Sequence, residues 1–389
     1  MEILYLSHCV PNPPDKGEKI RAHHAVRYLA ARHRLHLVCF ARDAAEREAA
    51  RQLESACASV YAEPFSHRGA LARAGLRFVL GDCLNTAYYA GRRARRYIDE
   101  LAKRAKIEAS VVFSAAMAPL APAHIPLLLD MSDVDSLKWV QYAELRRPAF
   151  LYALEARRMR RLEIALAVRA RRVWLSTARE EALYRGMAPG AVTEVLENGS
   201  DADYFNPAAA SGAAGLAGRR LLVFVGTMDY YPNRDAALWF AREIYPALRG
   251  SDPTLEFFIV GRNPTADVRQ LGSTAGVTVT GAVEDVRPYL AAAVAFVAPM
   301  RIARGIQNKV LEALAMGCRV LASPAVAATF GDPLPAGVRR CDSAEDYRAA
   351  LAGPGAQTRE QIREAARARF DWDRNMSRID AELDRIRHE

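Results

Sequence analysis

The sequence predicts an α/β protein built from two parallel-sheet domains. Three observations support this prediction: a length of 389 residues, a regular alternation of short apolar runs with helical patterns, and a charge-poor break at residues 205–215. At roughly 100–200 residues per domain, the length alone suggests two domains. Apolar runs that alternate with helical patterns are typical of a parallel sheet covered by helices.

The first part of the chain opens as strand, helix and strand. Residues 3–7 and 35–40 are short apolar runs, and residues 18–31 between them have helical spacing. Further strands are expected at 60–62, 111–114, 127–130, 173–176 and 193–196, and helices at 97–106, 136–144 and 150–168. The loop 11–17 contains Pro11, Pro13 and Pro14, so it cannot be helical. It follows the first strand, where loops of a parallel sheet build ligand sites.

After the break, whose small residues indicate a linker, the alternation starts again. Strands are expected at 221–225, 255–260, 277–280, 294–298 and 319–322, and helices at 236–248, 266–272, 286–293, after Gly305, and at 344–351, 358–369 and 372–387. We therefore predict a first domain over residues 1–206, a linker over 207–219 and a second domain over 220–370.

Composition indicates a cytoplasmic protein. Hydrophobic residues make up 51% of the chain and charged residues 25%, which is ordinary for a globular protein. No apolar run approaches the roughly 18 residues that span a bilayer, and the amino terminus lacks the pattern of a signal peptide. The six cysteines have no metal-binding spacing, so we expect reduced thiols and no metal site. They are Cys9, Cys39, Cys57, Cys83, Cys318 and Cys341.

The net charge of +9 is concentrated in three arginine-rich runs of the first half, at 92–96, 157–161 and 169–172. Each run taken singly is explained by a solvated helix face. Together they suggest an acidic partner, either the anionic headgroups at the inner face of the cell membrane or a phosphorylated acceptor. Nucleic acid is not expected, because no aromatic residues are interleaved with the arginines and no binding motif is present.

The segment 299–317 has the pattern of an anion site. It leads from the apolar run 294–298 through a turn with Arg301, Arg304 and Gly305 into a helix. Free backbone N–H groups and the positive end of the helix dipole meet at such a helix start. Lys309 adds a further charge there, and Glu312, one turn into the helix, can accept hydrogen bonds from hydroxyl groups. A diphosphate with an attached sugar matches these groups.

Each of these residues also has a plainer explanation. Cations at a helix start oppose the helix dipole, so Arg301 and Lys309 fit a bound anion better than an empty surface. Arg304 fits either explanation, and Glu312 could pair with a nearby arginine. Two further positions at strand ends could approach the phosphates, or could simply be a turn and an exposed side chain. They are Gly226 and Arg262.

Six ordered segments resemble a known family. They are 13–21, 130–139, 197–201 with Phe205 and Pro207, 225–228 with Pro232 and Asn233, 260–262, and 305–317. In this order they resemble the two-domain glycosyltransferases of family 4, whose fold is called GT-B. More closely, they resemble the sugar transferases found with the exosortase/PEP-CTERM exopolysaccharide systems of bacteria.

The resemblance implies two Rossmann-like domains facing across a cleft, with a carboxyl-terminal helix, residues 371–389, that crosses back to the first domain. It implies a retaining, metal-independent transfer that needs no cofactor. The donor, a UDP- or GDP-sugar, would be held by the second domain, and a glycan acceptor, expected to be lipid-linked, by the first. Exopolysaccharide biosynthesis is the expected process.

The resemblance also assigns residues. Arg301, Lys309 and Glu312 would form the catalytic set, with Glu312 on the ribose and the two cations on the diphosphate. Donor-binding positions would be Gly226, Arg262, Arg304, Gly305, Ile306, Gln307 and Asn308. The family has two glutamates eight positions apart, and here Arg304 stands where the first, near the hexose, is expected.

On the acceptor side we expect Lys16, Gly17, Arg21 and Asp130 at the cleft. Asp130 belongs to an acidic group with Asp133 and Asp135, which could bind acceptor hydroxyls or assist as a base, or could cap a helix. A family histidine of this domain has no match in the segment 114–117. Because the hexose-side glutamate is also missing, a non-catalytic nucleotide-sugar sensor or scaffold at the membrane is the alternative function.

Overall fold

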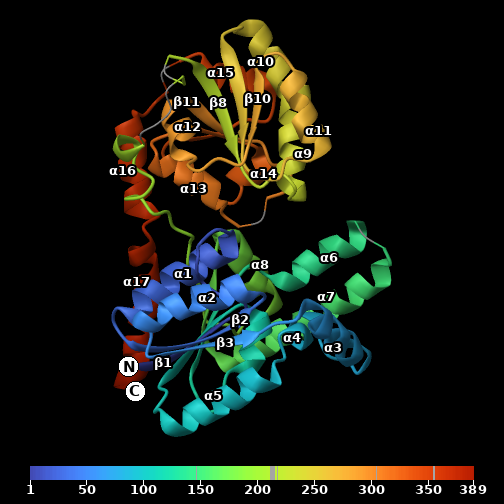
Figure 1. The fold of residues 1–389 in the computed structure, drawn as a ribbon, viewed down its shortest axis with the longest axis vertical. Helices are drawn as coiled ribbons and strands as arrows, with labels where there is room; N and C mark the ends of the chain where they lie inside the picture. The colour runs from blue at the N-terminus through green and yellow to red at the C-terminus, as the bar shows by residue number, and fades with distance from the viewer. Residues whose placement is uncertain (146, 211–214, 217, 304, 354) are drawn as a thin grey trace. The chain divides into compact units, whose positions relative to one another are not determined.

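The protein divides into two compact units in a computed structural model, which describes residues 1–145, 147–210, 215–216, 218–303, 305–353 and 355–389. The first unit contains Met1–Glu197 and Asp373–Glu389, and the second contains Asn198–Trp372. Figure 1 shows a sheet covered by helices in each unit. Among the described residues, no helix is both long and apolar enough to cross a membrane.

The first unit is built on a seven-stranded sheet in the order β3-β2-β1-β4-β5-β6-β7, and every neighbouring pair is parallel. The strands are β1 (Glu2–Ser7), β2 (Arg34–Ala41), β3 (Ser59–Pro64), β4 (Ala109–Phe113), β5 (Leu127–Ser132), β6 (Ala170–Leu175) and β7 (Thr193–Val195). The central strands β1, β2 and β4 are apolar and almost wholly buried, since helices cover both faces.

The helices of this unit are α1 (Gly17–Ala30), α2 (Ala44–Arg51), α3 (His67–Val79), α4 (Leu84–Tyr88), α5 (Arg92–Arg104), α6 (Asp135–Leu145), α7 (Ala149–Arg169), α8 (Ala178–Met187) and α17 (Trp372–His388). Short 3₁₀ turns occur at Gln52–Ser55 and Ala115–Leu120. The sequence did not predict α2, α3, α4 or α8. In α3 only Ala70 and Ala74 are buried, so the core-facing stripe that marks an amphipathic helix is missing.

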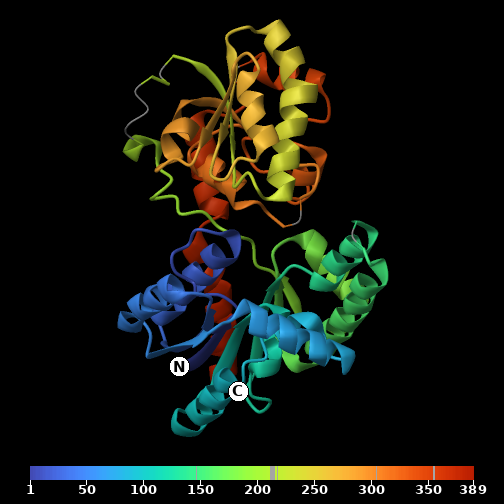
Figure 2. The same cartoon turned by 45° about the vertical axis from the view of Figure 1, so that its right-hand side comes forward.

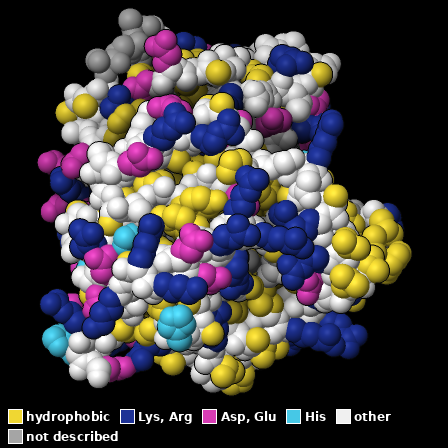
Figure 3. Space-filling view, turned by 60° about the horizontal axis from the view of Figure 1, so that its bottom comes forward, with side chains coloured by type: hydrophobic (Ala, Val, Ile, Leu, Met, Phe, Trp, Pro, Cys, Tyr) yellow, Lys and Arg dark blue, Asp and Glu magenta, His cyan; other side chains and the backbone are white. Residues whose placement is uncertain are grey.

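The arginine-rich runs of the first half lie on α5, on α7 and at the junction of α7 with β6. The four arginines of α5 in the run 92–96 are exposed, as are Arg157, Arg160 and Arg161 of α7. Figure 3 shows Lys and Arg side chains gathered beside apolar side chains on one face of the molecule.

The second unit has a six-stranded parallel sheet in the order β10-β9-β8-β11-β12-β13. Its strands are β8 (Arg220–Val225), β9 (Leu255–Val260), β10 (Val277–Gly281), β11 (Ala293–Ala298), β12 (Val320–Ala322) and β13 (Val338–Arg340). The two parallel sheets confirm the predicted fold class, and every predicted strand overlaps an observed one. The short edge strand β13 was not predicted, because its sequence VRR has little apolar character.

The helices of the second unit are α9 (Tyr231–Trp239), α10 (Tyr245–Ser251), α11 (Ala266–Gln270), α12 (Arg287–Ala292), α13 (Asn308–Ala315), α14 (Pro324–Ala327), α15 (Ala344–Leu351) and α16 (Arg359–Arg369). A π-helical turn at Phe240–Ile244 connects α9 to α10, so the helix predicted over 236–248 is one interrupted run. Short 3₁₀ turns lie at Pro207–Ala209 and Leu271–Ser273.

Residues 198–206, which the sequence placed in the first domain, belong to the second unit. The backbone N–H of Ser200 donates to the carbonyl of Phe370 at 2.8 Å. The guanidinium of Arg363 donates to the carbonyls of Ala202 and Phe205 at 2.7 and 2.6 Å. These backbone acceptors hold the segment against α16, a contact that local sequence does not encode.

Helix α17 completes the first unit, as the resemblance implied. Figure 1 and Figure 2 show it along the sheet of that unit. Met376, Ile379 and Leu383 are buried on its inner side. Beside them, Arg172 of β6 pairs with Glu382 at 2.9 Å, and Asp380 lies 2.5 Å from His33.

Two glycines bring the ends of β8 and β9 into close contact. A Cβ atom at Gly261 would lie 1.8 Å from the carbonyl oxygen of Gly226. The φ of Gly261 is 145°, a conformation that other residues rarely adopt. The N–H of Gly226 in turn donates to Val260 at 3.0 Å. Only glycine at 261 therefore permits this approach of the two turns.

We expect Gly261→Ala to lower the free energy of unfolding by about 3 kcal/mol or more, because its methyl group would overlap backbone that cannot move away as a side chain can. Gly281→Ala is the matched control: its φ of 71° is also positive, but a Cβ there meets nothing within 4 Å. It should cost about 1–2 kcal/mol from backbone strain alone. Denaturant titration measures both, and equal losses would contradict the close-contact explanation.

We expect Leu383→Ala to lower the free energy of unfolding by about 2–5 kcal/mol, because it leaves a cavity under α17. Asp384→Ala, at an exposed position of the same helix, should change stability by no more than about 0.5 kcal/mol. Hydrogen exchange localises the effect, which should appear in β1, β2 and β6. A loss confined to the second unit would show that α17 does not stabilise the first.

Candidate functional site

The segment predicted as an anion site connects β11 to α13. Gly305 turns the chain with a φ of 60°, and α13 begins three residues later at Asn308. Gln307 occupies the N-cap position, but its side chain makes no capping hydrogen bond to the first turn of the helix. The N–H of Val310 donates to the carbonyl of Gln307 at 2.9 Å, and the helix dipole adds positive potential at the start of the helix.

Lys309 is the cation best placed at this helix start. Its Nζ donates to Oδ1 of Asn233 on α9 at 2.5 Å and lies 4.9 Å from the ring centre of Phe224 in β8. Asn233 is oriented by a second bond, from its Nδ2 to the carbonyl of Thr227 at 3.0 Å. Within the described ranges Lys309 forms no ion pair, so the ammonium is held by a neutral amide.

Gly226 lies against this pair. A Cβ atom there would meet Nδ2 of Asn233 at 2.8 Å and Nζ of Lys309 at 3.0 Å. The sequence left open whether Gly226 was only a turn or allowed close approach, and the structure places its backbone directly beside the Lys309 ammonium. A side chain at 226 would displace the cation.

Burial shifts the protonation of both ionisable groups on this part of α13. Desolvation lowers the pKa of the Lys309 ammonium to about 8, although the charge of Glu312 opposes the shift. Desolvation also raises the pKa of the Glu312 carboxyl to about 7, against the attraction of Lys309. Both side chains remain partly exposed, so a ligand can reach them. The described protein groups do not fully compensate the charge of the Lys309 ammonium. A bound anion would compensate it.

Arg301 has a partner that the sequence did not reveal. Its guanidinium makes two hydrogen bonds to the carboxylate of Asp235 on α9, from Nε at 3.0 Å and from NH2 at 2.5 Å. This pairing raises the pKa of Arg301 through the hydrogen bond to Asp235. Its side chain is 55% exposed, so the ion pair lies at the surface of the unit. Arg304 lies outside the described residues.

The remaining predicted donor-side residues lie between Gly305 and the first turn of α13. Ile306 is buried, and its carbonyl accepts a bond from Asn198 Nδ2 at 3.2 Å. The same Nδ2 donates to Oδ1 of Asn308 at 3.0 Å. Nδ2 of Asn308 is buried and has no hydrogen-bond partner in the described part of the chain. Gln307 Nε2 contacts the carbonyl of Gly305 at 3.4 Å.

Arg262 follows Gly261 in the turn after β9 and is half-buried. Its carbonyl accepts a hydrogen bond from the N–H of Met228 at 2.9 Å, which joins the turn to the one after β8. Three supporting residues were missed by the sequence analysis as site residues, namely Asn198, Asn233 and Asp235. The first two lie within segments that carried the family resemblance.

The four residues predicted on the acceptor side separate into two pairs. Lys16 and Gly17 are exposed at the start of α1, and Lys16 makes no capping bond. Arg21 and Asp130 are buried and bind each other, through Nε at 2.7 Å and NH2 at 2.8 Å. Arg21 NH1 also donates to the carbonyl of Leu196 at 2.9 Å. In this arrangement the two buried side chains join α1, β5 and the end of β7.

His8, Glu18 and Arg42 form a cluster of ionisable groups near α1 that was not among the predicted site residues. Nε2 of His8 lies 3.3 Å from the carboxylate of Glu18, which is also 3.6 Å from Arg42. The hydrogen bond from His8 is the main cause that lowers the pKa of Glu18 to about 2. The His8 ring packs on Tyr89 and Phe113.

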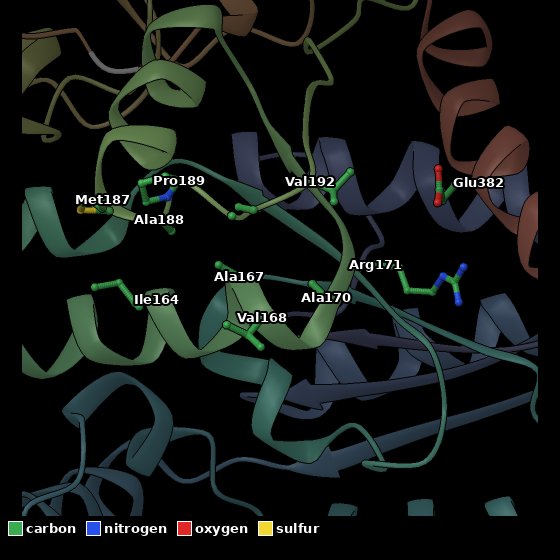
Figure 4. A pocket seen from close by; sticks show the side chains of 12 residues that line it. Ile164, Ala167, Val168, Ala170, Arg171, Met187, Ala188, Pro189, Val192 and Glu382 are labelled. Atoms are coloured by element: carbon green, nitrogen blue, oxygen red, sulfur yellow. The ribbon is translucent and has the colours of Figure 1, made fainter.

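A cavity of 580 Å³ in the first unit contains none of the predicted residues. Its lining is mostly apolar and comes from the ends of α7 and α8, with the polar side chains of Arg171 and Glu382 at one side (Figure 4). Its two charged side chains are already paired, Arg171 with Glu389 and Glu382 with Arg172 and Arg385, so the cavity is given no role.

Comparisons with known proteins agree with the fold. Residues 219–338 match the model of the family described as glycosyl transferases group 1. No curated protein matches the sequence. This matched range contains Gly226, Asn233, Arg262, Arg301 and Lys309, so the candidate site lies in the part of the chain that the family describes.

Solved structures match over nearly the whole chain at low sequence identity. Alr3699/HepE of Anabaena, solved with UDP, is 14% identical over 99% of this chain and 100% of its own, with a TM-score of 0.67. A glycosyltransferase of Rickettsia africae is 13% identical over 99% and 98%, with a TM-score of 0.63. WaaG, a glycosyltransferase involved in lipopolysaccharide biosynthesis, is 18% identical over 97% and 94%, with a TM-score of 0.58. The chain therefore has the GT-B fold of glycosyltransferases.

Proposed function

We propose that this protein is a retaining, metal-independent glycosyltransferase that transfers a sugar from a nucleoside-diphosphate sugar to a hydroxyl group of a glycan. The main support is the incompletely compensated Lys309 ammonium, held by Asn233 beside the Gly226 backbone at the uncapped start of α13. UDP-sugars are the first donors to test, because the similar Alr3699/HepE structures contain UDP and UDP-glucose.

In this proposal the diphosphate occupies the space before α13. Lys309 and the first N–H groups of the helix would contact its oxygens, with the backbone of Gly226 and the turn at Gly305 close by. Glu312, whose carboxylate accepts no hydrogen bond from described residues, would accept bonds from the ribose hydroxyls. Arg301 would reach the diphosphate by exchanging Asp235 for phosphate oxygens, and Arg262 would approach from the neighbouring turn.

The chemical step follows from this placement. The bond between the anomeric carbon and the diphosphate oxygen breaks, and the acceptor hydroxyl forms a bond to the same face of that carbon. The leaving phosphate takes the proton of the hydroxyl, so no protein nucleophile is needed. Lys309 and the helix start stabilise the charge that grows on the diphosphate, which is the largest contribution expected from a preorganised site.

Two pairs of residues are proposed on the acceptor side. Lys16 and Gly17 are exposed where the chain enters α1, and they remain our candidates for contact with the acceptor. Arg21 and Asp130 would act indirectly, since they are buried against each other. A lipid-linked acceptor, exopolysaccharide biosynthesis with an exosortase/PEP-CTERM system, and a position at the inner membrane face are the cellular setting we propose. The exposed arginines of α5 and α7 support the last of these.

Lys309→Ala should lower UDP affinity about 10- to 100-fold and reduce turnover at least as much, because a charge-assisted contact is lost. Glu312→Gln should weaken binding about 3- to 10-fold, since the amide still accepts one hydrogen bond. Arg340→Ala is the control, a surface arginine paired with Asp342 at the edge of the same sheet. Calorimetry with UDP and a UDP-release assay measure the effects.

Wild-type turnover and affinity in both variants would place the site elsewhere. Tight donor binding without hydrolysis or transfer, across a panel of donors and acceptors, would favour the non-catalytic sensor.

UDP affinity should fall as pH rises above about 8, because Lys309 loses its proton there. The fall should reach about tenfold per pH unit, as expected for one linked proton. Lys309→Arg keeps its charge throughout this range, so its affinity should stay constant between about pH 7.5 and about pH 9.5. Calorimetry in buffers of different ionisation enthalpy would show proton uptake on binding by the wild type alone. An unchanged slope in the arginine variant would assign the titration to another group.

A further inference from the structure

Helix α3 carries an apolar surface that faces outward. Leu71, Leu76, Val79 and Leu80 are 51%, 67%, 81% and 76% exposed. At 100° per residue Leu76 and Val79 point away from the buried Ala70 and Ala74, and Leu71 and the C-cap residue Leu80 lie at the two margins of that outward side. The helix is thus amphipathic in the reverse sense: small residues pack against the protein, and large apolar residues face outward.

Polar contacts hold α3 in this orientation. Arg158 of α7 donates from NH1 to the carbonyls of Phe78 and Asp82 at 2.5 and 2.9 Å, which satisfies acceptors at the end of α3. Its guanidinium also lies 4.2 Å from the centre of the Phe78 ring. On the helix itself, Arg73 donates to the carbonyls of Ala87 and Tyr88. Rotation of α3 to bury its leucines would break these bonds.

A buried carboxylate fixes the segment that follows. Glu155 of α7 is fully buried and accepts the N–H groups of Leu84 and Asn85 at 2.8 and 3.1 Å. It thereby caps the start of α4, which packs on α3. The connection between α3 and α4 is bonded to α7 at both ends. These bonds fix the orientation in which the apolar side of α3 faces outward.

The charge around this surface is positive. Helix α3 contains Arg68, Arg73 and Arg77 and no acidic residue, although Arg77 is paired at 2.6 Å with Asp82, just after the helix. The two glutamates of α7, Glu155 and Glu163, are fully buried, whereas its arginines at 157, 160 and 161 are exposed. Exposed apolar side chains next to arginines are the composition of helices that lie in the headgroup region of anionic bilayers.

The size of the apolar surface argues against a second copy of the chain as its partner. Four side chains with these exposures offer on the order of 500 Å², less than the roughly 800 Å² per partner of a stable interface. Insertion into a bilayer surface has no such minimum, because each buried side chain adds to membrane affinity and the arginines add electrostatic attraction.

We propose that α3 docks the protein on an anionic lipid bilayer, with Leu71, Leu76, Val79 and Leu80 in the headgroup region and the nearby arginines on lipid phosphates. The cellular role of this docking rests on the proposed function, which already includes a position at the membrane. The docking itself depends only on α3 and on the exposed arginines of α3 and α7.

The test uses the full chain and vesicles of phosphatidylcholine alone or mixed with an equal part of phosphatidylglycerol, in a sedimentation assay. The wild type should bind the mixed vesicles, with affinity falling as salt rises, and should not bind phosphatidylcholine alone. The double variant Leu76→Gln/Val79→Gln should bind at least about tenfold more weakly, because it removes apolar area without adding charge. Arg157→Gln/Arg161→Gln should reduce binding and its salt dependence.

Val168→Gln is the matched control, since Val168 is 90% exposed but lies on α7 outside the α3 surface. It should bind as the wild type does. All variants should keep wild-type thermal stabilisation by UDP, which separates docking from the donor site. Normal vesicle binding by the α3 variant, loss of binding by Val168→Gln, or self-association that only the α3 variant loses would each overturn the proposal.

Discussion

The contact between Lys309 and Asn233 is the interaction on which the second unit's candidate site depends. It places a partly desolvated cation at the start of α13, where no carboxylate of the described residues forms an ion pair with it. The contact is possible because two backbone turns meet at the carboxyl ends of β8 and β9, where Gly261 and Gly226 leave no side chain between them. An anion that enters this space replaces water around Lys309 with a full opposite charge.

Helix α9 carries the hydrogen-bond partners of both Lys309 and Arg301. Asn233 holds Lys309, and two residues further along the same helix Asp235 holds Arg301. The two cations therefore differ. Lys309 is hydrogen-bonded to a neutral amide and its pKa is lowered, whereas Arg301 is paired with the carboxylate of Asp235 at the surface. A bound diphosphate would therefore compensate the charge of Lys309 more than that of Arg301. The spacing of the two cations along the chain does not reveal this difference.

The first unit uses buried charge for a different purpose. Arg21 and Asp130 bind each other inside the unit, and Glu155 caps α4 from within α7. Buried pairs of this kind are costly to break, since the remaining partner would be left uncompensated. They hold α1, β5 and α7 in place while exposed groups, among them Lys16 and the outward face of α3, stay available for contacts outside the unit.

The sequence by itself determined the two parallel sheets and nearly all of their strands, and it predicted an anion site at residues 299–317, because apolar periodicity and helix-start chemistry are local properties. Only the tertiary structure decided which charges are compensated. It paired Arg301 with Asp235, closed Arg21 on Asp130, assigned residues 198–206 to the second unit, and turned the apolar side of α3 outward. The physical reason is that each outcome depends on a partner distant in the chain, and burial and charge compensation are set by those partners.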